Sequence, residues 1–476
     1  MTSTARPPAT AAGRLTAYHR RTLRALVGDW PRTTRPLPWA LAGFMAMLFL
    51  LPFDSIDLPL GLPLEAKLDR PLLLLIVALW VLSLTILDGA QRVHFTPIHY
   101  AFVGFVLIAI LSLVYNAETT VRLGEMELGV RKLALLISYL TLFVVVASGV
   151  RPGEVRAFMT YMCALSVILA LAVIWEYRYE FNVFFTWTGN FLPVSIPPEL
   201  GNSDSIGRRS VIGPTIHPLA PAMMMACTMP FALVSMYESS DLRRKILWGA
   251  AAGVMLAAAL ATQRKTSIVA PVAAIVVLLA YRPRMMRQLI PGMIGLFLLA
   301  HVFTPGALGG VGTQLLPQNM FGVASTVDRQ SDYAAIEPDV VNRPLLGRGY
   351  ETYDQKKYRI LDNQFLTTII GTGVIGILSY ISIFLAIFLI AHRVARNGKD
   401  DRVGPALAIS AATLAMLVGS GLLDILALPQ LPYLICFFAG FAAVLSRELG
   451  TETAAQTART ARRTPLGPGG PLPAAR

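Results

Sequence analysis

An aspartate and an asparagine, Asp362 and Asn363, stand directly before a long apolar run in the stretch DNQFLTTIIGTGVIGIL. A carboxylate in this position could accept a proton from a sugar hydroxyl and act as a general base. The same carboxylate could instead cap the helix by accepting from the free N–H groups of its first turn, with Leu361 and Leu366 as flanking hydrophobic-staple residues. One side chain can serve both roles, so the spacing leaves both open.

Two cationic pairs lie at the ends of apolar runs. Arg264 and Lys265 occur in the short turn ATQRKTS, and Arg208 and Arg209 precede His217 in GRRSVIGPTIHPLAP. Several fixed cationic donors, with arginine gripping bidentately, are suited to hold a diphosphate. The alternative for these cations is snorkelling toward lipid headgroups. His217 is a second candidate for proton transfer, or a hydrogen-bonded side chain at the membrane surface.

A long polar segment before Asp362 offers further candidates. Arg329 and Arg348 could add positive charge to a phosphate site, or be solvated surface residues. Gly347 and Gly349, in LLGRGYETYD, could allow the backbone to approach a ligand closely, although a turn is the usual reason for such glycines. Three tyrosines could stack on sugar faces or form an ordinary surface cluster: Tyr350, Tyr353 and Tyr358.

Several chemistries are excluded by the motifs that the sequence lacks. No GxxxxGK[ST] phosphate loop, HExxH helix or DxD pair occurs in the expected outer loops, which argues against ATP-driven and metal-hydrolase reactions. The three cysteines, Cys163, Cys227 and Cys436, fall inside apolar runs, so a disulfide framework or cysteine metal site is not expected. Asp54 and Asp57, in PFDSIDLP, form a reserve catalytic site or are plain loop acids. We expect neither a metal nor another cofactor.

The elements that must position these residues are apolar helices. The chain has 476 residues, of which 55% are hydrophobic and only 14% are charged, a composition typical of a protein in lipid. Apolar runs of about 20 residues predict an all-α polytopic membrane protein with about twelve transmembrane helices. The expected spans are 38–53, 71–87, 97–114, 132–150, 157–176, 216–237, 245–262, 265–281, 287–303, 363–391, 404–425 and 431–446.

The expected organisation follows from these spans and from a large, partly helical outer loop before the tenth. It comprises a disordered basic cytoplasmic tail (residues 1–36), five transmembrane helices (37–176), an outer loop (177–215), helices six to nine (216–303), the large outer loop (304–362), the last three helices (363–446) and a disordered cytoplasmic tail (447–476).

The net charge of +13 is explained by orientation. With both termini in the cytoplasm, short inner loops such as DLRRK (241–245), YRPRMMR (281–287) and HRVARNGKDDR (392–402) carry the excess of lysine and arginine, as the positive-inside rule requires. Binding to nucleic acid is therefore not needed to explain the basic balance. The outer side holds both long loops, which loop-length statistics favour as functional segments.

The chain resembles the O-antigen ligase/polymerase superfamily, a group of GT-C-type membrane glycosyltransferases. Four elements carry the resemblance in chain order: RRSVIGPTIHPLAPA (208–222), TQRKTS (262–267), Arg329 with NRPLLGRGYETYD (342–354), and DNQFLTTIIGTGVIGIL (362–378). The likeness covers about residues 200–390, whereas the amino-terminal third is similar in the number of spans alone.

The resemblance implies a multi-pass protein of the bacterial plasma membrane that acts in cell-surface polysaccharide synthesis. A polyprenyl-pyrophosphate-linked oligosaccharide on the outer leaflet would donate its sugar chain to a glycan or lipid acceptor. It further implies that Arg208 or Arg209, Arg264 and Arg329 hold the pyrophosphate. Asp362 takes the place of a histidine found in many ligases, a departure that slightly favours polymerase over ligase.

Three other functions remain open from the sequence. Twelve spans would also suit a secondary transporter, although no repeat relates the two halves of the chain. A lipid-glycan flippase could use the same cations without any base. A glycosyltransferase of different lineage could use Asp54 or Asp57.

Overall fold

The structure is a computed structural model of the chain. It describes residues 30–56, 67–86, 94–198, 200–201, 210–284, 302, 304, 306, 309, 323–355, 357–398 and 400–463. For residues 323–330, 400 and 448–463 it describes the backbone alone.

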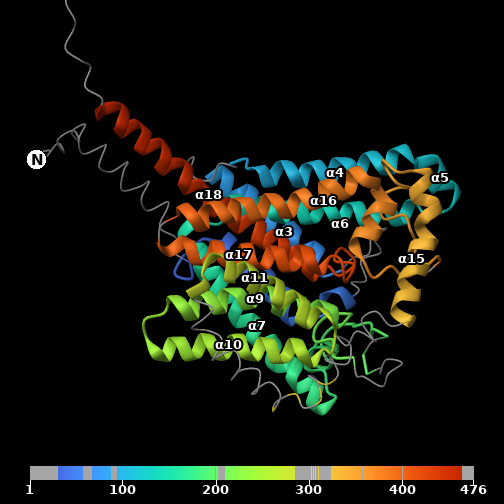
Figure 1. The fold of residues 1–476 in the computed structure, drawn as a ribbon, viewed down its shortest axis with the longest axis horizontal. Coiled ribbons are helices and arrows are strands. Elements are labelled where there is room, and N and C mark those ends of the chain that lie inside the picture. The colour runs from blue at the N-terminus through green and yellow to red at the C-terminus, as the bar shows by residue number, and fades with distance from the viewer. Residues whose placement is uncertain are drawn as a thin grey trace, which may run out of the picture.

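The described part of the chain is built from helices (Figure 1). The long helices are α2 (Pro36–Leu50), α3 (Asp69–Ile86), α4 (Pro97–Tyr115), α6 (Met126–Gly149), α7 (Val155–Tyr179), α9 (Leu219–Glu238), α10 (Leu242–Ala261), α11 (Thr266–Tyr281), α15 (Val323–Asn342), α16 (Gln364–Asn397), α17 (Asp400–Gly419) and α18 (Gln430–Arg463). Shorter elements are η1 (Phe53–Ser55), α5 (Ala117–Arg122), η2 (Pro152–Glu154) and α8 (Val183–Gly189). Within the same residues there is no strand, and a single isolated bridge joins Ile56 to Val194.

Eight of the described helices are long and apolar enough to cross a membrane. Two further apolar helices, α2 and α11, are shorter, with 15 and 16 residues. The class expected from the sequence, an all-α polytopic membrane protein, is therefore confirmed, while the number of twelve spans stays a prediction. The expected span 287–303 lies almost wholly outside the described residues.

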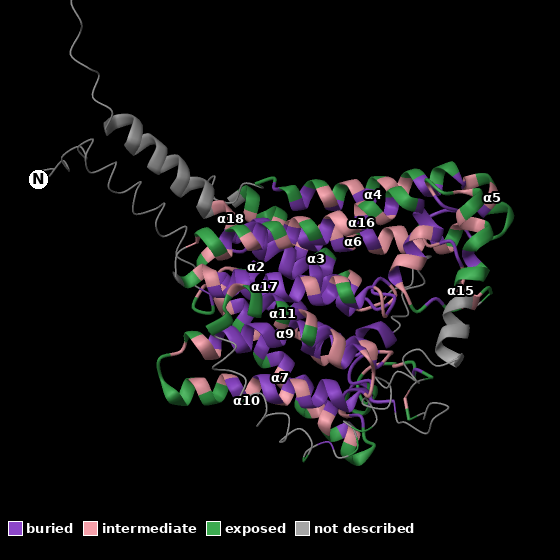
Figure 2. Ribbon diagram, viewed as in Figure 1, coloured by how far each residue is buried: buried purple, intermediate pink, exposed green. Residues whose placement is uncertain are grey.

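The surface of the bundle is apolar where lipid would contact it. Leucines on peripheral helices stay largely exposed, among them Leu74 on α3, Leu107 on α4 and Leu378 on α16. In contrast, α9 and residues 430–447 of α18 are almost completely buried and form the centre of the molecule (Figure 2). Such exposure would be unfavourable in water, whereas in a bilayer these side chains replace lipid–lipid contacts.

The helix boundaries follow local sequence signals. Pro36 and Pro97 occupy the first turns of α2 and α4, where a missing N–H costs nothing. Asp241 caps α10 by accepting a hydrogen bond from the Arg243 N–H at 3.2 Å. Two expected boundaries shift: α17 ends at Gly419, so the last residues of the expected span 404–425 form a connection, and α18 continues to Arg463.

Helix α16 is broken at Gly373, whose φ of 68° and ψ of −166° are not helical. The break leaves backbone groups on both sides without helical partners, and residues 344–349 supply those partners. The N–H groups of Arg348 and Gly349 donate to the carbonyls of Ile370 and Gly371 at 2.9 and 3.1 Å. The Val374 N–H donates to the Pro344 carbonyl at 2.8 Å. The segment after α15 is thereby docked against a membrane helix.

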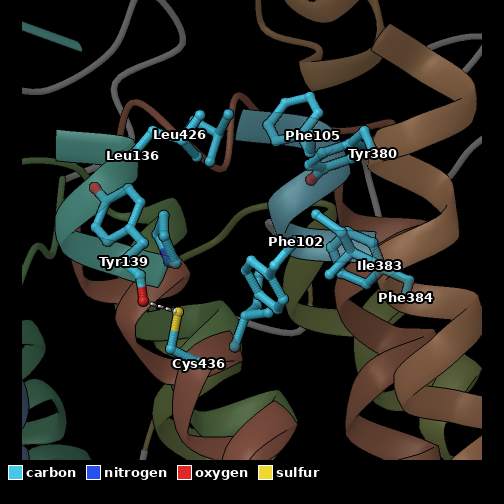
Figure 3. Close-up of a pocket in the computed structure, with 11 residues that line it drawn as sticks. Phe102, Phe105, Leu136, Tyr139, Tyr380, Ile383, Phe384, Leu426 and Cys436 are labelled. Carbon is cyan, nitrogen blue, oxygen red and sulfur yellow. Dashed lines mark hydrogen bonds between the residues drawn. The ribbon is translucent and has the colours of Figure 1, made fainter. Parts of the chain in front are cut away.

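A small apolar cavity of about 30 Å³ lies between α4, α6, α16 and α18 (Figure 3). Aromatic rings from these helices line it, including Phe102, Tyr139 and Tyr380, and the Cys436 thiol donates to the Tyr139 carbonyl at 3.2 Å (Figure 3). An apolar cavity of this size is a packing feature, too small for a sugar or a lipid chain.

Candidate functional site

The helices run in alternating directions, so chain segments distant in sequence meet at one end of the bundle. Helices α5 and α15 lie together at that end, on the right of Figure 1, and we call it the α15 end. The α10–α11 turn and the first residue of α16 lie there as well, because α10 runs toward this end and both α11 and α16 start from it. Arg264, Lys265 and Arg329 are on these segments, and Asp362 and Asn363 directly precede α16.

The two cationic stretches meet at Ser210. Arg264, in the turn between α10 and α11, lies with its Nη2 at 3.4 Å from the Ser210 hydroxyl. Ser210 follows Arg208 and Arg209 in sequence, although these two arginines lie outside the described residues. Both Arg264 and Lys265 are partly buried. The structure therefore brings Arg264 to the sequence stretch that begins with Arg208 and Arg209.

Ser210 lines a cavity of about 260 Å³, which we call the Ser210 cavity. Its wall comes from the end of α7, from α8 and from the loop that follows α8. The lining residues are Glu176, Glu180, Phe181, Asn182, Phe185, Thr186, Leu200, Gly201, Ser210 and Val211.

The loop that carries Ser210 is fixed to α7 by a buried carboxylate. Glu176 accepts hydrogen bonds from the N–H groups of Ile212 and Gly213 at 3.1 and 2.9 Å. Asn182 adds a bond from its side-chain amide to the Gly213 carbonyl at 2.7 Å. Gly213 has a φ of 57°, a left-handed conformation that glycine adopts without strain. These contacts hold the loop that carries Ser210 at the C-terminal end of α7.

His217 lies at the start of α9 and is partly buried. Its Nδ1 accepts a hydrogen bond from the Leu219 N–H at 3.3 Å. This bond is the kind that a structural role requires, and it fixes the ring orientation. The catalytic role of His217 stays a prediction.

Arg348 differs from the solvated surface residue that the sequence suggested. It is only 7% exposed, and its guanidinium forms ion pairs with Glu125 at 2.6 Å and Asp339 at 3.1 Å. The reason is that the segment around it docks inside the bundle, where a buried charge needs partners. Arg348 is therefore a paired arginine that joins α15 to the start of α6.

The two glycines beside Arg348 serve packing. Gly347 and Gly349 have φ values of 62° and 125°, which confirms a turn. A Cβ at Gly347 would lie 2.5 Å from the carbonyl carbon of Gly371 in α16, so only glycine lets the segment reach the broken helix. The backbone that these glycines bring close is that of α16.

Asn363, not Asp362, is the helix cap. α16 begins at Gln364, and the Asn363 side chain accepts from the Phe365 N–H at 2.9 Å. Asp362 is exposed, and its carboxylate has no hydrogen bond or ion pair with the described residues. The capping role expected for Asp362 is therefore wrong by one residue, because asparagine bonds the helix N-terminus as well as aspartate does. Its role as a base stays a prediction.

Other candidates fall outside the described residues or are paired. Arg329 lies in α15, where the backbone alone is described. Asp57 lies outside the described residues. Asp54 is buried and accepts from the Lys67 ammonium at 2.7 Å.

The structure adds one group that sequence reasoning missed, a pair of acids at the α15 end. Glu351 follows the docked glycine turn, and Asp424 lies between α17 and α18. Burial raises the pKa of Glu351 to about 7; the Asp424 carboxylate also raises it, and Lys132 lowers it. Burial likewise raises the pKa of Asp424, which accepts from Gln355 and Thr367 at 3.0 and 3.2 Å.

A signal for this pair was present in the sequence. Asp424 is an acid within the otherwise apolar stretch SGLLDILALPQ, and such residues are functional candidates by default. Glu351 has a φ of 51°, a left-handed conformation that is uncommon outside glycine and concentrated at functional sites. No local pattern, however, indicates that the two acids meet.

No protein-family model matches the chain, and no curated protein matches it.

Proposed function

We propose that this protein is a membrane glycosyltransferase that uses a polyprenyl-pyrophosphate-linked glycan on the outer leaflet. It would polymerise repeat units or transfer them to an acceptor in the synthesis of a cell-surface polysaccharide. The single observation that carries the proposal is the contact of Arg264 with Ser210, which joins two cationic stretches beside a cavity at the α15 end. The resemblance to the O-antigen ligase/polymerase superfamily supports the same function.

The reaction breaks the bond between the anomeric carbon and the pyrophosphate and forms a bond from that carbon to an acceptor hydroxyl oxygen. The pyrophosphate leaves with the bonding electrons, and its negative charge grows during the step. Arginines held near low-dielectric lipid stabilise such charge more strongly than they would in water. Arg264, Lys265, Arg208 or Arg209, and Arg329 are the residues proposed for this role.

The acceptor hydroxyl must lose a proton in the same step. Besides Asp362 and His217, we propose Glu351 as the base, since a carboxyl with a pKa of about 7 is half ionised at neutral pH and strong enough to take a proton. The negative charge of Asp424 would raise the pKa of Glu351. No nucleotide or metal takes part in this proposal.

The proposed location is the bacterial plasma membrane, with both termini in the cytoplasm and the α15 end outside. The exposed leucines of the peripheral helices support a place in a bilayer. The basic loops at the opposite end support this orientation.

The decisive experiment is reconstitution of the purified protein in vesicles with a polyprenyl-pyrophosphate-linked oligosaccharide isolated from the producing cells. A ladder of products in mass spectra means a polymerase, and a single added block on a distinct acceptor means a ligase. We expect Arg264→Ala to lower the rate by about a hundredfold to a thousandfold, the usual effect of losing one charge-stabilising donor.

Arg244→Ala is the matched control, because Arg244 is an exposed arginine at the opposite end of α10. We expect it to retain the full rate. Unchanged product formation by Arg264→Ala at equal protein levels would contradict the proposed role of Arg264. Absence of product from the unaltered protein would contradict the function itself.

A second function has one observation in its favour. Two interacting carboxyls beside a lysine could bind and release a proton during coupled transport. Vesicles that take up solute in proportion to a proton gradient, without any new glycosidic bond, would identify a transporter. Loss of a flippase would instead leave the lipid-linked glycan in the inner leaflet.

A further inference from the structure

A second cavity of about 260 Å³ lies at the α15 end, and we call it the Glu125 cavity. Its walls come from α5, from the start of α6, from α15 and from the docked segment that follows α15. The lining residues are Thr119, Thr120, Leu123, Glu125, Asp339, Arg343, Arg348 and Tyr358, all of which are described. Two of them were candidates from the sequence, Arg348 for a phosphate site and Tyr358 for stacking on a sugar; the other six were not assigned to a ligand above.

The charges in this cavity balance. Two carboxylates, Glu125 and Asp339, face two guanidinium groups, Arg343 and Arg348. Arg348 is held by both carboxylates, and Glu125 also accepts from the Tyr358 hydroxyl at 2.6 Å. The charges that line the cavity therefore sum to zero, with Arg343 bonded to the neutral side chains of Asn116 and Thr119. Outside the lining, the half-exposed Lys357 pairs with Glu125 at 3.2 Å.

Hydrogen-bonding groups remain available in the same cavity. Arg343 uses two of its five N–H groups, on Asn116 at 2.6 Å and on Thr119 at 3.4 Å. Asp339 bonds Arg348 through Oδ2, which leaves its other oxygen as an acceptor. The Thr119 hydroxyl accepts from Arg343 and still has a proton to donate. Donors and acceptors therefore occur side by side, as the hydroxyl groups of a sugar ring require.

An apolar and aromatic wall accompanies these polar groups. Tyr358 is 42% exposed and stacks on Tyr353, with 5.0 Å between ring centroids. The Arg348 guanidinium lies 4.7 Å from the centre of the Tyr358 ring, which holds the ring in place. Leu123 contributes an exposed apolar side chain. The C–H faces of a sugar ring pack against such surfaces.

We propose that the Glu125 cavity binds one uncharged sugar ring of the glycan substrate. The proposal rests on the proposed function and adds that the pyrophosphate and a sugar ring bind at separate places. Arg264, which lies beside Ser210, takes the pyrophosphate, and the Glu125 cavity takes a neutral pyranose. The segment that carries Arg343 and Arg348 continues in sequence to Glu351, the proposed base.

The test measures binding of simple sugars to the full-length protein in nanodiscs. Methyl glycosides of hexoses, N-acetylhexosamines, 6-deoxyhexoses and hexuronic acids are screened by saturation-transfer NMR, and inorganic pyrophosphate is titrated by calorimetry. We expect at least one neutral glycoside to bind. Thr119→Val, which removes one hydroxyl, should weaken that binding about threefold to tenfold.

A filling variant sharpens the test. Thr119→Trp should abolish glycoside binding because the indole occupies the cavity. Thr160→Val and Thr160→Trp make the same changes at an exposed site near the start of α7, at the opposite end, and should leave glycoside binding intact. Pyrophosphate binding should respond to Arg264→Ala and not to either Thr119 variant.

Three results would overturn the proposal. They are no binding of any neutral glycoside in the panel, glycoside binding that survives Thr119→Trp, or displacement of the glycoside by pyrophosphate. None of these measurements requires turnover. Sugar binding that is sensitive to Thr119 in a protein that forms no product would retain this site and contradict the glycosyltransferase instead.

Discussion

Glu351 lies where the backbone leaving the docked glycine turn meets the connection between α17 and α18. Its carboxyl lacks a hydrogen bond from the described residues, whereas Asp424 receives three: from Gln355, from Thr367 and from the Ala427 N–H. Two acids with such different hydrogen-bond partners have different pKa values. The less hydrogen-bonded acid is the better acceptor for a substrate proton.

The pH dependence of turnover tests this assignment. A base must be ionised, so the rate should rise with pH through the pKa of Glu351, about 7, and level off above it. Asp424→Asn removes a charge that raises this pKa, so the rising limb should move to lower pH. Lys132→Met removes a charge that lowers the pKa, so the limb should move to higher pH.

Turnover of the lipid-linked oligosaccharide between pH 5 and 9 gives the measurement. Glu351→Gln should lose the limb together with most of the rate. A limb that stays in place in both Asp424→Asn and Lys132→Met would assign proton transfer to another group, with Asp362 and His217 as the next candidates.

For individual residues, the sequence predicted which types of side chain would be present better than it predicted which side chains they would contact. Arg264 follows the end of α10, as expected, because span ends are visible in an apolar pattern. Arg208 and Arg209 lie outside the described residues, and the phosphate site stays a prediction. The capping residue was misplaced by one position, since Asp362 and Asn363 are both good caps and backbone geometry alone decides between them. The pairing of Arg348 with Glu125 depends on residues 223 positions apart, which no local pattern reveals.

Helix α16 is the element that organises the α15 end. Its break at Gly373 opens the hydrogen-bond ladder at the point where residues 344–349 dock. The Ser112 hydroxyl on α4 reinforces the junction from the other side, at 2.7 and 2.8 Å from the carbonyl oxygens of Leu346 and Gly371. Three segments of the chain are thus joined through backbone carbonyls at one place.

Substitution of Gly373 tests the importance of the break. A Cβ at this position would lie 2.3 Å from the carbonyl carbon of Leu345, and the φ of 68° is unfavourable for other residues. We expect Gly373→Ala to destabilise the protein by more than about 1–3 kcal/mol, the usual cost of such backbone strain. Thermal unfolding in detergent, followed by fluorescence-detected size exclusion, measures the change.

Gly43→Ala is the matched control within α2, because a Cβ there meets nothing within 4 Å. Alanine favours a helix over glycine by about 1 kcal/mol, so this variant should be as stable as the original protein or more so. Equal melting temperatures for the two variants would show that the α16 break is not required.

Most elements were visible in the sequence as apolar runs, although α17 ends before its predicted span does and α18 continues to Arg463, well past the predicted end at 446. A different kind of departure occurs in α16: the run 363–391 predicts one continuous helix, and its GTG sequence gives no sign of a break. The break exists because another segment supplies the missing partners, a tertiary effect that periodicity does not carry.

The whole molecule is a bundle whose two ends differ in chemistry. The α15 end holds both cavities, the acid pair and α15 itself. The opposite end holds short connections and the ion pair between Arg156 and Glu238. The sequence predicts two unlike sides from the lengths of the loops and from the distribution of lysine and arginine, and which end faces outward stays a prediction.

Labelling of cysteine variants tests the orientation. The native cysteines are all buried, so a maleimide that does not cross membranes should give a low background. Asn190→Cys, at the α15 end, should react in intact cells. Ser240→Cys, between α9 and α10, should react only after permeabilisation. The reverse pattern would place the proposed active side in the cytoplasm and contradict the use of an outer-leaflet donor.

The docking of residues 344–349 onto α16 also limits how the molecule can open. If this segment moved away from α16, the Ile370 carbonyl and the Val374 N–H would lose these partners, and the Gly371 carbonyl would keep the Ser112 hydroxyl alone. Each unpaired group in surroundings without water costs about 1–3 kcal/mol. Residues 344–349 and the helix bundle must therefore move as one body. A long lipid-linked donor would then enter laterally from the bilayer, passing between helices while residues 344–349 stay in place.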